Sequence, residues 1–480
     1  MAGGNESGVG RAGESVIICG GECGFSRSGF QVFEVGSFRS HDCHGVSRRA
    51  LLQFGAGLPL ASAVGGPAVA APGESVRPAR SVILLWLWGG PSHLDTFDPK
   101  PEAPQEIRGP FSTMSTRTPG LHVSELFPRL ATRSNRFSVI RSHHNHTSVH
   151  RVAGSIALSG NKGASGDSDY GPTIGSIVQR HRGGDGALPR FVSITPGPLK
   201  TALGSVQGSG GGRWGRAYDP VAVRCSDTGE VNIPSLRLLE GLRLERLSDR
   251  RLLLGVLDRT TALANDARSA AWSDSFARAY RLLTSVEGRR VFDLSRESER
   301  IRGRYGASVF GQGCLLARRL VEAEVPFVQV NWSQYVENIY GSRTDFGWDT
   351  HWLNFEHMAD RHGPILDRAL SALLDDLSER GLLDSTLVVA IGEFGRTPKI
   401  SGNAGRDHWP AVYSSLWAGG GVIPGQVIGQ SDGRAYAAVT EPITPDMVVT
   451  TMLQQAGVDT EGRARLRVFE EGRVIDGLVS

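Results

Sequence analysis

Apolar residues follow two different spacings along the chain, and each spacing predicts a different kind of element. Continuous apolar runs such as SVILLWLW and LVVAI predict strands that are buried on both faces of a sheet. Runs of this kind lie at residues 81–88, 137–141, 190–194, 325–332 and 387–391, and a further apolar run covers 412–418. By contrast, leucines recur three and four positions apart at 366, 370, 373 and 377, which predicts a helix from about 353 to 380 with one buried face.

Strands that alternate with helical segments predict one large α/β domain over residues 78–480. We expect a doubly wound, mostly parallel sheet with helices on both faces. The stretch of about 161–312 shows less regular hydrophobic spacing, and we interpret it as a cover of helices and loops. Within it, residues 233–305 are predicted to be mostly helical. The glycine-rich stretch 204–213 lacks the lysine and hydroxyl of a phosphate-binding loop, so it predicts flexible cover.

Composition and charge argue against some classes of protein, namely nucleic-acid-binding proteins and integral membrane proteins. The 480 residues can bury a large core, and the net charge of +3 with interspersed arginines and acids argues against a nucleic-acid partner. No run is long and apolar enough to predict an integral membrane span. Cys225 and Cys314 are the two cysteines after the amino-terminal segment, and they could pair or stay free. The oligomeric state is not indicated.

Residues 47–71 predict an export signal. Arg48 and Arg49 form a twin-arginine pair, a short apolar run follows, and Ala68-Val69-Ala70 offers small residues for cleavage. Residues 1–46 come before this segment and predict an unstructured extension. We therefore expect a periplasmic or extracellular protein that is exported by the twin-arginine route.

The stretch from 347 to 410 holds the strongest candidate chemistry. Asp349, His351, Glu393 and His408 are nitrogen and oxygen ligands of the kind that hold a divalent cation such as zinc, calcium, magnesium or manganese. Glu393 directly follows an expected strand, and ligands in α/β sheets bind at the carboxyl ends of strands. The alternative for each residue is a helix cap or a salt-bridge partner. Arg396 would neutralise an ester anion through paired hydrogen bonds.

Two earlier segments add candidates. Gly89 and Gly90 end the first expected strand, and Ser92 and Asp95 follow as a possible substrate contact and metal ligand. Histidines concentrate at 143–150, where His144, His146 and His150 could bind metal or an anionic or sugar substrate. A helix is expected to begin near Thr147 or Ser148. A hydroxyl there is either a helix cap or a nucleophile that the helix dipole favours.

Several strings of the chain resemble a large family of exported proteins, the domain of unknown function number 1501. In chain order the strings are GGPSHLDTFDPKPEAPQEIRGPF, GWDTH, LVVAIGEFGRTPKI and GRDHWP, within a likeness over about residues 45–480. That family is similar in turn to the alkaline phosphatase and sulfatase superfamily. The resemblance implies an alkaline-phosphatase-like core, one or two divalent metals at the strand ends, and hydrolysis of phosphate or sulfate esters.

The resemblance carries over to single residues only in part. It implies that Asp95 is the first-strand carboxylate, that residues 146–160 hold the nucleophile and its helix, and that His408 is the distal histidine. The sulfatase Cys-x-Pro-x-Arg signature is absent, so a formylglycine nucleophile is not expected. Phe394 stands where the superfamily usually has a histidine, which weakens the expectation of two metals.

The sequence thus predicts a metal-dependent hydrolase of phosphate or sulfate esters on small molecules or polysaccharides. Asp349, His351, Glu393, His408 and Asp95 would serve the metal, and Thr147, Ser148 or a metal-bound water would attack. The alternative is an exported protein without catalysis that binds carbohydrate or an anion at a relict metal site. A second alternative is a partner in a larger envelope complex.

Overall fold

The computed structural model describes residues 78–160, 170–184, 186–197, 199–201, 204–205, 209–234, 285–336 and 346–480, and the backbone of 32–34 and 37–39. Internal contacts separate two units, Met1–Glu74 and Ser75–Ser480. In the first unit, β1 (Val32–Glu34) and β2 (Ser37–Arg39) pair antiparallel. The export signal expected at 47–71 lies outside the described residues.

A large mixed sheet forms the centre of the second unit. Its strands lie in the order β11 (Val231–Asn232), β10 (Val221–Cys225), β7 (Phe191–Ile194), β12 (Phe327–Asn331), β3 (Ser81–Trp86), β13 (Thr386–Ile391), β16 (Tyr413–Ala418), β6 (Phe137–His143) and β17 (Val427–Ile428). The pairings from β10 to β13 are parallel, whereas β16 is antiparallel to both β13 and β6. The expected mostly parallel sheet is therefore confirmed.

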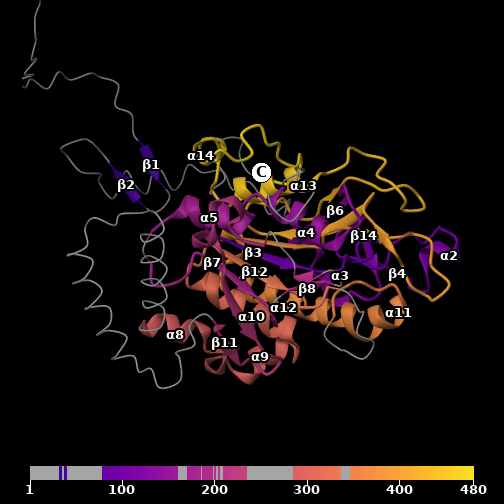
Figure 1. Ribbon diagram of the computed structural model, residues 1–480, viewed down its shortest axis with the longest axis horizontal. Coiled ribbons are helices and arrows are strands. Elements are labelled where there is room, and N and C mark those ends of the chain that lie inside the picture. The colour runs from indigo at the N-terminus through magenta and orange to yellow at the C-terminus, as the bar shows by residue number, and fades with distance from the viewer. Residues whose placement is uncertain are drawn as a thin grey trace, which may run out of the picture. The chain divides into compact units, whose positions relative to one another are not determined.

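Helices cover both faces of this sheet (Figure 1). Successive side chains of a strand point to opposite faces, so Ile83 and Leu85 pack with α10 (Val309–Glu322) and α12 (Gly363–Glu379). Val82, Leu84 and Trp86 pack on the other side with α5 (Ile174–Arg182) and α13 (Pro445–Gln455). Two separate apolar cores thus lie against the two faces of the same strand, and every residue of β3 is buried.

Shorter elements complete the described unit. The other α-helices of the described residues are α2 (Gln105–Arg108), α3 (Pro128–Ala131), α4 (His150–Ser159), α8 (Val286–Phe292), α9 (Glu299–Tyr305), α11 (Asn354–His357) and α14 (Thr460–Leu466), and η6 (Met358–His362) is a π-helical turn. Short 3-10 helices are η1 (Ser134–Arg136), η2 (Gly212–Trp214), η3 (Arg216–Tyr218), η5 (Leu294–Arg296) and η7 (Leu383–Ser385). Three small hairpins are β4 (Thr113–Ser115) with β5 (His122–Ser124), β8 (Lys200–Thr201) with β9 (Gly204–Ser205), and β14 (Gly395–Arg396) with β15 (His408–Trp409).

Two segments differ in part from the elements that the sequence predicts. The helix expected over 353–380 is interrupted by η6, so α11, η6 and α12 share that range. The strand expected at 190–194 is present as β7, and the stretch of about 161–312 also supplies β10 and β11, which were not expected, to the sheet. Cys225 and Cys314 are both buried and unpaired. Among the described residues, none of the helices combines the length and the apolar character that crossing a membrane would need.

Candidate metal centre

Loops at one edge of the sheet bring the candidate residues together. The parallel strands β3, β12 and β13 all end at this edge, and the chain beyond them supplies Gly89, Asp349 and Glu393. Gly89 has a φ of +104°, and a side chain there would overlap the backbone of Trp348 and Asp349. The absence of a side chain at Gly89 therefore allows the backbone of the GWDTH loop to lie directly against the end of β3.

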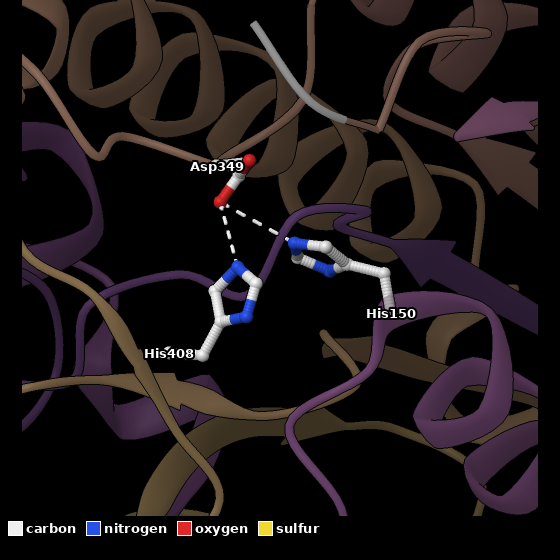
Figure 2. Close-up of side chains that lie close together, drawn as sticks. All are labelled: His150, Asp349 and His408. Atoms are coloured by element: carbon white, nitrogen blue, oxygen red, sulfur yellow. Dashed lines mark hydrogen bonds and ion pairs between the residues drawn. The ribbon is translucent and has the colours of Figure 1, made fainter. Parts of the chain in front are cut away.

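Asp349 is the common partner of this group, and its carboxylate is buried. Its Oδ1 lies 3.3 Å from His150 Nε2, 3.1 Å from His351 Nε2 and 3.1 Å from His408 Nε2. In Figure 2 the rings of His150 and His408 both point toward this oxygen. Donor atoms of His150, Asp349 and His408 all lie within 4.8 Å of one another. These three residues form the candidate metal centre.

Two of the imidazoles are each held in orientation by a different carboxylate. His150 Nδ1 donates to Glu393 Oε1 at 2.5 Å, and the same oxygen accepts from the Gly89 amide at 2.9 Å. His351 Nδ1 donates to Asp407 Oδ1 at 2.6 Å. When Nδ1 carries the proton in a neutral imidazole, Nε2 keeps its lone pair, which is the arrangement that metal-binding histidines usually show. Both Nε2 atoms face Asp349.

The β14–β15 hairpin supplies the third imidazole. Its register places His408 opposite Arg396, so the two side chains reach Asp349 from neighbouring strands. His408 Nε2 also lies 2.9 Å from His351 Nε2. The His408 and His351 side chains are about one quarter exposed, whereas His150 is almost completely buried. The centre is thus open on the side of His351 and His408.

Charges inside the centre are balanced in pairs. Burial lowers the pKa of His150, but hydrogen bonds and charges of Asp349 and Glu393 outweigh burial and raise that pKa to about 9. Burial would raise the pKa of Asp349, yet Arg396 and His150 hold it well below its usual range. Without a cation, protonated His150 and Arg396 therefore oppose the Asp349 and Glu393 carboxylates. Burial, with help from Arg396 and His150, lowers the pKa of His408.

The residues present fit a divalent cation. Imidazole nitrogens and a carboxylate oxygen are preferred ligands of zinc, and four ligands held at about 2.1 Å in a tetrahedron lie about 3.4 Å apart. The separations of 3.1 to 3.3 Å around Asp349 Oδ1 are close to this value. His150 Nε2 and Glu393 Oε2 are among the buried side-chain atoms of the described residues that make no hydrogen bond. His150 Nε2 faces Asp349 Oδ1 at 3.3 Å, and a cation bound between these two atoms would contact both.

The five residues that were expected to serve the metal take different positions in the structure. Asp349, His351 and His408 point toward one another, whereas Glu393 reaches the group through His150 Nδ1. His150 was expected to bind either metal or substrate, and its Nε2 lies in the candidate metal centre. It is the first residue of α4, and the preceding histidine cluster was the signal for it. Asp407 was missed, although it stands in the GRDHWP string next to His408.

Asp95 does not join this centre, because other side chains already saturate its carboxylate. Arg406 donates to both oxygens, at 2.8 and 3.2 Å, and Asn354 donates to Oδ2 at 2.9 Å. Asp95 and Arg406 are both completely buried. Asp95, which was expected to serve the metal, therefore forms a buried ion pair with Arg406 instead. Ser92 is buried as well, and its hydroxyl accepts from the Asp95 amide.

Arg396 also takes a different role from the one expected. It is fully buried, and it donates to Asp349 Oδ1 at 2.5 Å, to the carbonyl oxygens of Gly89 and Gly90, and to that of Arg406. With its donors directed at these groups, it holds Asp349 in place and does not face an incoming ester. The guanidinium is therefore a structural cation of the centre.

The expected nucleophile segment lies next to His150. The N-cap of α4 is Val149 and not Thr147 or Ser148, so the cap reading of Ser148 is wrong. Thr147 is half-buried and its hydroxyl accepts from the Val149 amide at 3.2 Å, while Ser148 is exposed. His144 is half-buried, and its ring lies 5.4 Å from that of exposed His146. Roles of these four residues in attack or substrate binding stay predictions.

A family model described as a protein of unknown function (DUF1501) matches residues 79–478. The chain belongs to this family. The match covers every residue of the DUF1501 candidate metal centre, and it confirms the resemblance that the GWDTH and GRDHWP strings indicated. A search of curated protein sequences finds no match.

Solved structures of Ps i-CgsB, of a sulfatase and of an alkaline phosphatase are similar to this DUF1501 chain over most of its length. Ps i-CgsB in complex with k-i-k-neocarrahexaose shares 10% identity with a TM-score of 0.39, covering 82% of this chain and 76% of that one. The sulfatase PsFucS1 from Pseudoalteromonas sp. shares 13% identity with a TM-score of 0.32, covering 84% of this chain and 72% of that one. A magnesium-bound mutant of TAB5 alkaline phosphatase shares 11% identity with a TM-score of 0.36, covering 80% of this chain and 99% of that one.

Proposed function

We propose that this DUF1501 chain is an exported, metal-dependent hydrolase of phosphate or sulfate esters, with polysaccharide esters as one substrate class. The observation that carries the proposal is the convergence of His150, Asp349 and His408 on one point, with His351 beside them. Three imidazole Nε2 atoms around one buried carboxylate oxygen form a set of nitrogen and oxygen ligands that suits a divalent cation. Export is proposed from the twin-arginine pattern at 47–71.

Each residue of the centre has a proposed part in holding the cation. His150, Asp349 and His408 would bind it, and His351 would complete the set from the open side. A bound divalent cation supplies a Lewis acid that polarises an ester oxygen and lowers the pKa of water to about 7. Glu393 and Asp407 keep the protons of His150 and His351 at Nδ1, so that Nε2 of each ring stays available.

The attacking group is proposed from position in the chain. Thr147 and Ser148 precede His150 by three and two residues, at the amino end of α4. A water molecule at the open side, next to His351 and His408, is the other candidate. In either case the buried Arg396 keeps Asp349 ionised, which preserves a negative ligand for the cation.

A second candidate function is binding without catalysis. It is supported by the two buried arginines, since Arg396 and Arg406 neutralise Asp349 and Asp95 and neither faces an ester. A chain of this kind would hold a cation and an anionic or sugar ligand but would not turn it over.

Metal content and turnover, measured together, separate the two functions. The purified protein would be dialysed, its metals quantified by mass spectrometry, and its hydrolysis of p-nitrophenyl phosphate and p-nitrophenyl sulfate followed. We expect a bound divalent metal and turnover of at least one ester, both lost in His408→Ala. The exposed His122→Ala is the matched control and should keep both. Bound metal without turnover on these and further esters would support the binding protein, and absence of metal would overturn both proposals.

A further inference from the structure

One aromatic side chain faces solvent next to the open side of the candidate metal centre. Trp352 is 48% exposed, and its ring centroid lies 5.9 Å from that of His351. Leu353, the next residue, is 49% exposed, and Val149, next to His150, is 41% exposed. Trp352 and Leu353 directly follow His351, so exposed apolar surface lies beside the open side of the centre.

The backbone on either side of Trp352 is fastened to the loop at 403–406. Thr350 O accepts from the Arg406 amide at 3.1 Å, and the Leu353 and Asn354 amides donate to Asn403 O and Ala404 O at 3.2 and 2.9 Å. Gly405 contacts His351 so closely that a side chain at Gly405 would overlap the carbonyl of His351. Trp352 is thus an exposed ring on a rigid support, which lowers the entropy lost when a ligand packs against it.

Both loops adopt left-handed backbone where glycine is absent. Leu353 has a φ of 49° and Ala404 a φ of 56°. Such residues are uncommon, and they persist only where the surrounding contacts impose them. The left-handed turn at Leu353 follows directly after Trp352 and leaves both side chains in solvent, although burying them would have been favourable.

We propose that Trp352 is the stacking platform for a sugar ring of the ester substrate, so that the substrate is a phosphorylated or sulfated saccharide. This inference rests on the proposed function, because it names the substrate class of the same site. An exposed aromatic face binds the apolar face of a pyranose ring, while hydroxyl groups at the ring edge need polar partners.

Polar partners of this kind stand beside the platform. The Asp407 carboxylate is 58% exposed, and the half-buried His351 lies between it and Asp349. A sugar ring that packs on Trp352 would place its hydroxyl groups near Asp407. The ester group of the same sugar would then point toward His351 and His408. An apolar partner surface would gain nothing from the exposed Asp407, which favours the saccharide.

Affinity electrophoresis tests the platform without turnover. Native gels would contain neutral dextran, dextran sulfate or ι-carrageenan, with EDTA present so that binding is read without metal. We expect at least one polysaccharide to retard the wild-type protein. Trp352→Ala should weaken that binding about tenfold, which is the usual contribution of one aromatic stacking contact. Trp352→Phe should keep most of the binding. Val439→Ala, a change at another exposed apolar residue, should leave binding unchanged.

Failure of the platform is distinguishable from failure of the hydrolase. Absence of retardation of the wild type by all three polysaccharides, or equal retardation of the wild type and Trp352→Ala, would overturn the platform. Retardation that depends on Trp352 in a protein without esterase turnover would support the platform and remove the hydrolase.

Discussion

At the scale of single residues, the centre is set by which nitrogen of each imidazole carries a proton. Glu393 and Asp407 each accept a hydrogen bond from an Nδ1 atom, so His150 and His351 turn Nε2 toward Asp349. The two carboxylates differ in burial, because Glu393 is fully buried and Asp407 is largely exposed. Asp407 can therefore be changed without disturbing the core.

Asp407→Asn should weaken divalent metal binding about tenfold while the fold is kept. The reason is that losing a carboxylate behind a ligating histidine typically lowers metal affinity by about 10- to 100-fold. Competition for Zn²⁺ against a chromophoric chelator measures the dissociation constant. Asp384→Asn, at another exposed aspartate, is the control and should bind as the wild type does. Equal affinities of Asp407→Asn and the wild type would show that His351 does not need its carboxylate.

At the scale of elements, α4 must lie very close to the end of β3 to bring His150 to Asp349. Gly154 in α4 makes this possible, since a methyl group there would overlap the ring of Trp88. Gly303 in α9 is also helical, but a methyl group there would meet no atom within 4 Å. The two glycines therefore have opposite expected effects when changed to alanine.

Gly154→Ala should destabilise the protein by about 1–3 kcal/mol, because overpacking a tight contact forces the helix or Trp88 to move. Gly303→Ala should instead stabilise it by about 0.5–1 kcal/mol, the ordinary gain of alanine over glycine in a helix. Urea denaturation of both variants measures the free energy of unfolding. Gly154→Ala should also bind metal more weakly, because His150 would shift. A neutral or stabilising Gly154→Ala would contradict the close packing of α4.

The pairing of β6 with β16 contains a buried histidine that makes folding sensitive to acid. His143 contacts Ser415 Oγ through Nε2 at 2.6 Å, its Nδ1 has no hydrogen-bond partner, and burial lowers its pKa to about 3. The unfolded chain binds this proton near pH 6.5 and the folded chain only near pH 3. The unfolded state thus binds more protons between these values, so stability falls as the pH drops through this range.

At pH 5 this single group should cost about 2 kcal/mol of stability relative to pH 7.5, since 1.5 pH units below its unfolded pKa correspond to that amount. Denaturation curves at the two pH values, for the wild type and His143→Asn, measure the effect. The loss between pH 7.5 and 5 should be smaller by about this amount in the variant. An unchanged loss would assign the acid sensitivity to other groups.

At the scale of the whole molecule, the sequence predicts strands and loop ligands better than buried pairs. The apolar runs of β3 and β13 and the strings around Asp349 and His408 are local signals, so the sheet and most of the centre could be predicted. The pairing of Asp95 with Arg406, 311 residues apart, has no local signal, and the same holds for Arg396 with Asp349. A carboxylate at a strand end indicates a cation of some kind, but it does not indicate whether that cation is a metal or an arginine.

The predicted export signal at residues 47–71 can be tested on the whole chain. The small residues at 68–70 should be the cleavage site, so the mature protein should begin near residue 71. Amino-terminal sequencing of protein recovered from the periplasm or medium would show this. Arg48→Lys with Arg49→Lys should keep the precursor in the cytoplasm, because the twin-arginine route reads both arginines. A mature protein that begins well before Gly65 would contradict the signal.

Anomalous diffraction from crystals of the metal-loaded protein tests the candidate centre most directly. Data collected on both sides of the zinc absorption edge would locate the ion independently of the side chains. We expect one peak at about 2.0–2.2 Å from His150 Nε2, Asp349 Oδ1 and His408 Nε2, the usual bond lengths for zinc. A map without a peak between these atoms, while Asp349 keeps its contacts with Arg396 and the imidazoles, would contradict a metal centre at this position.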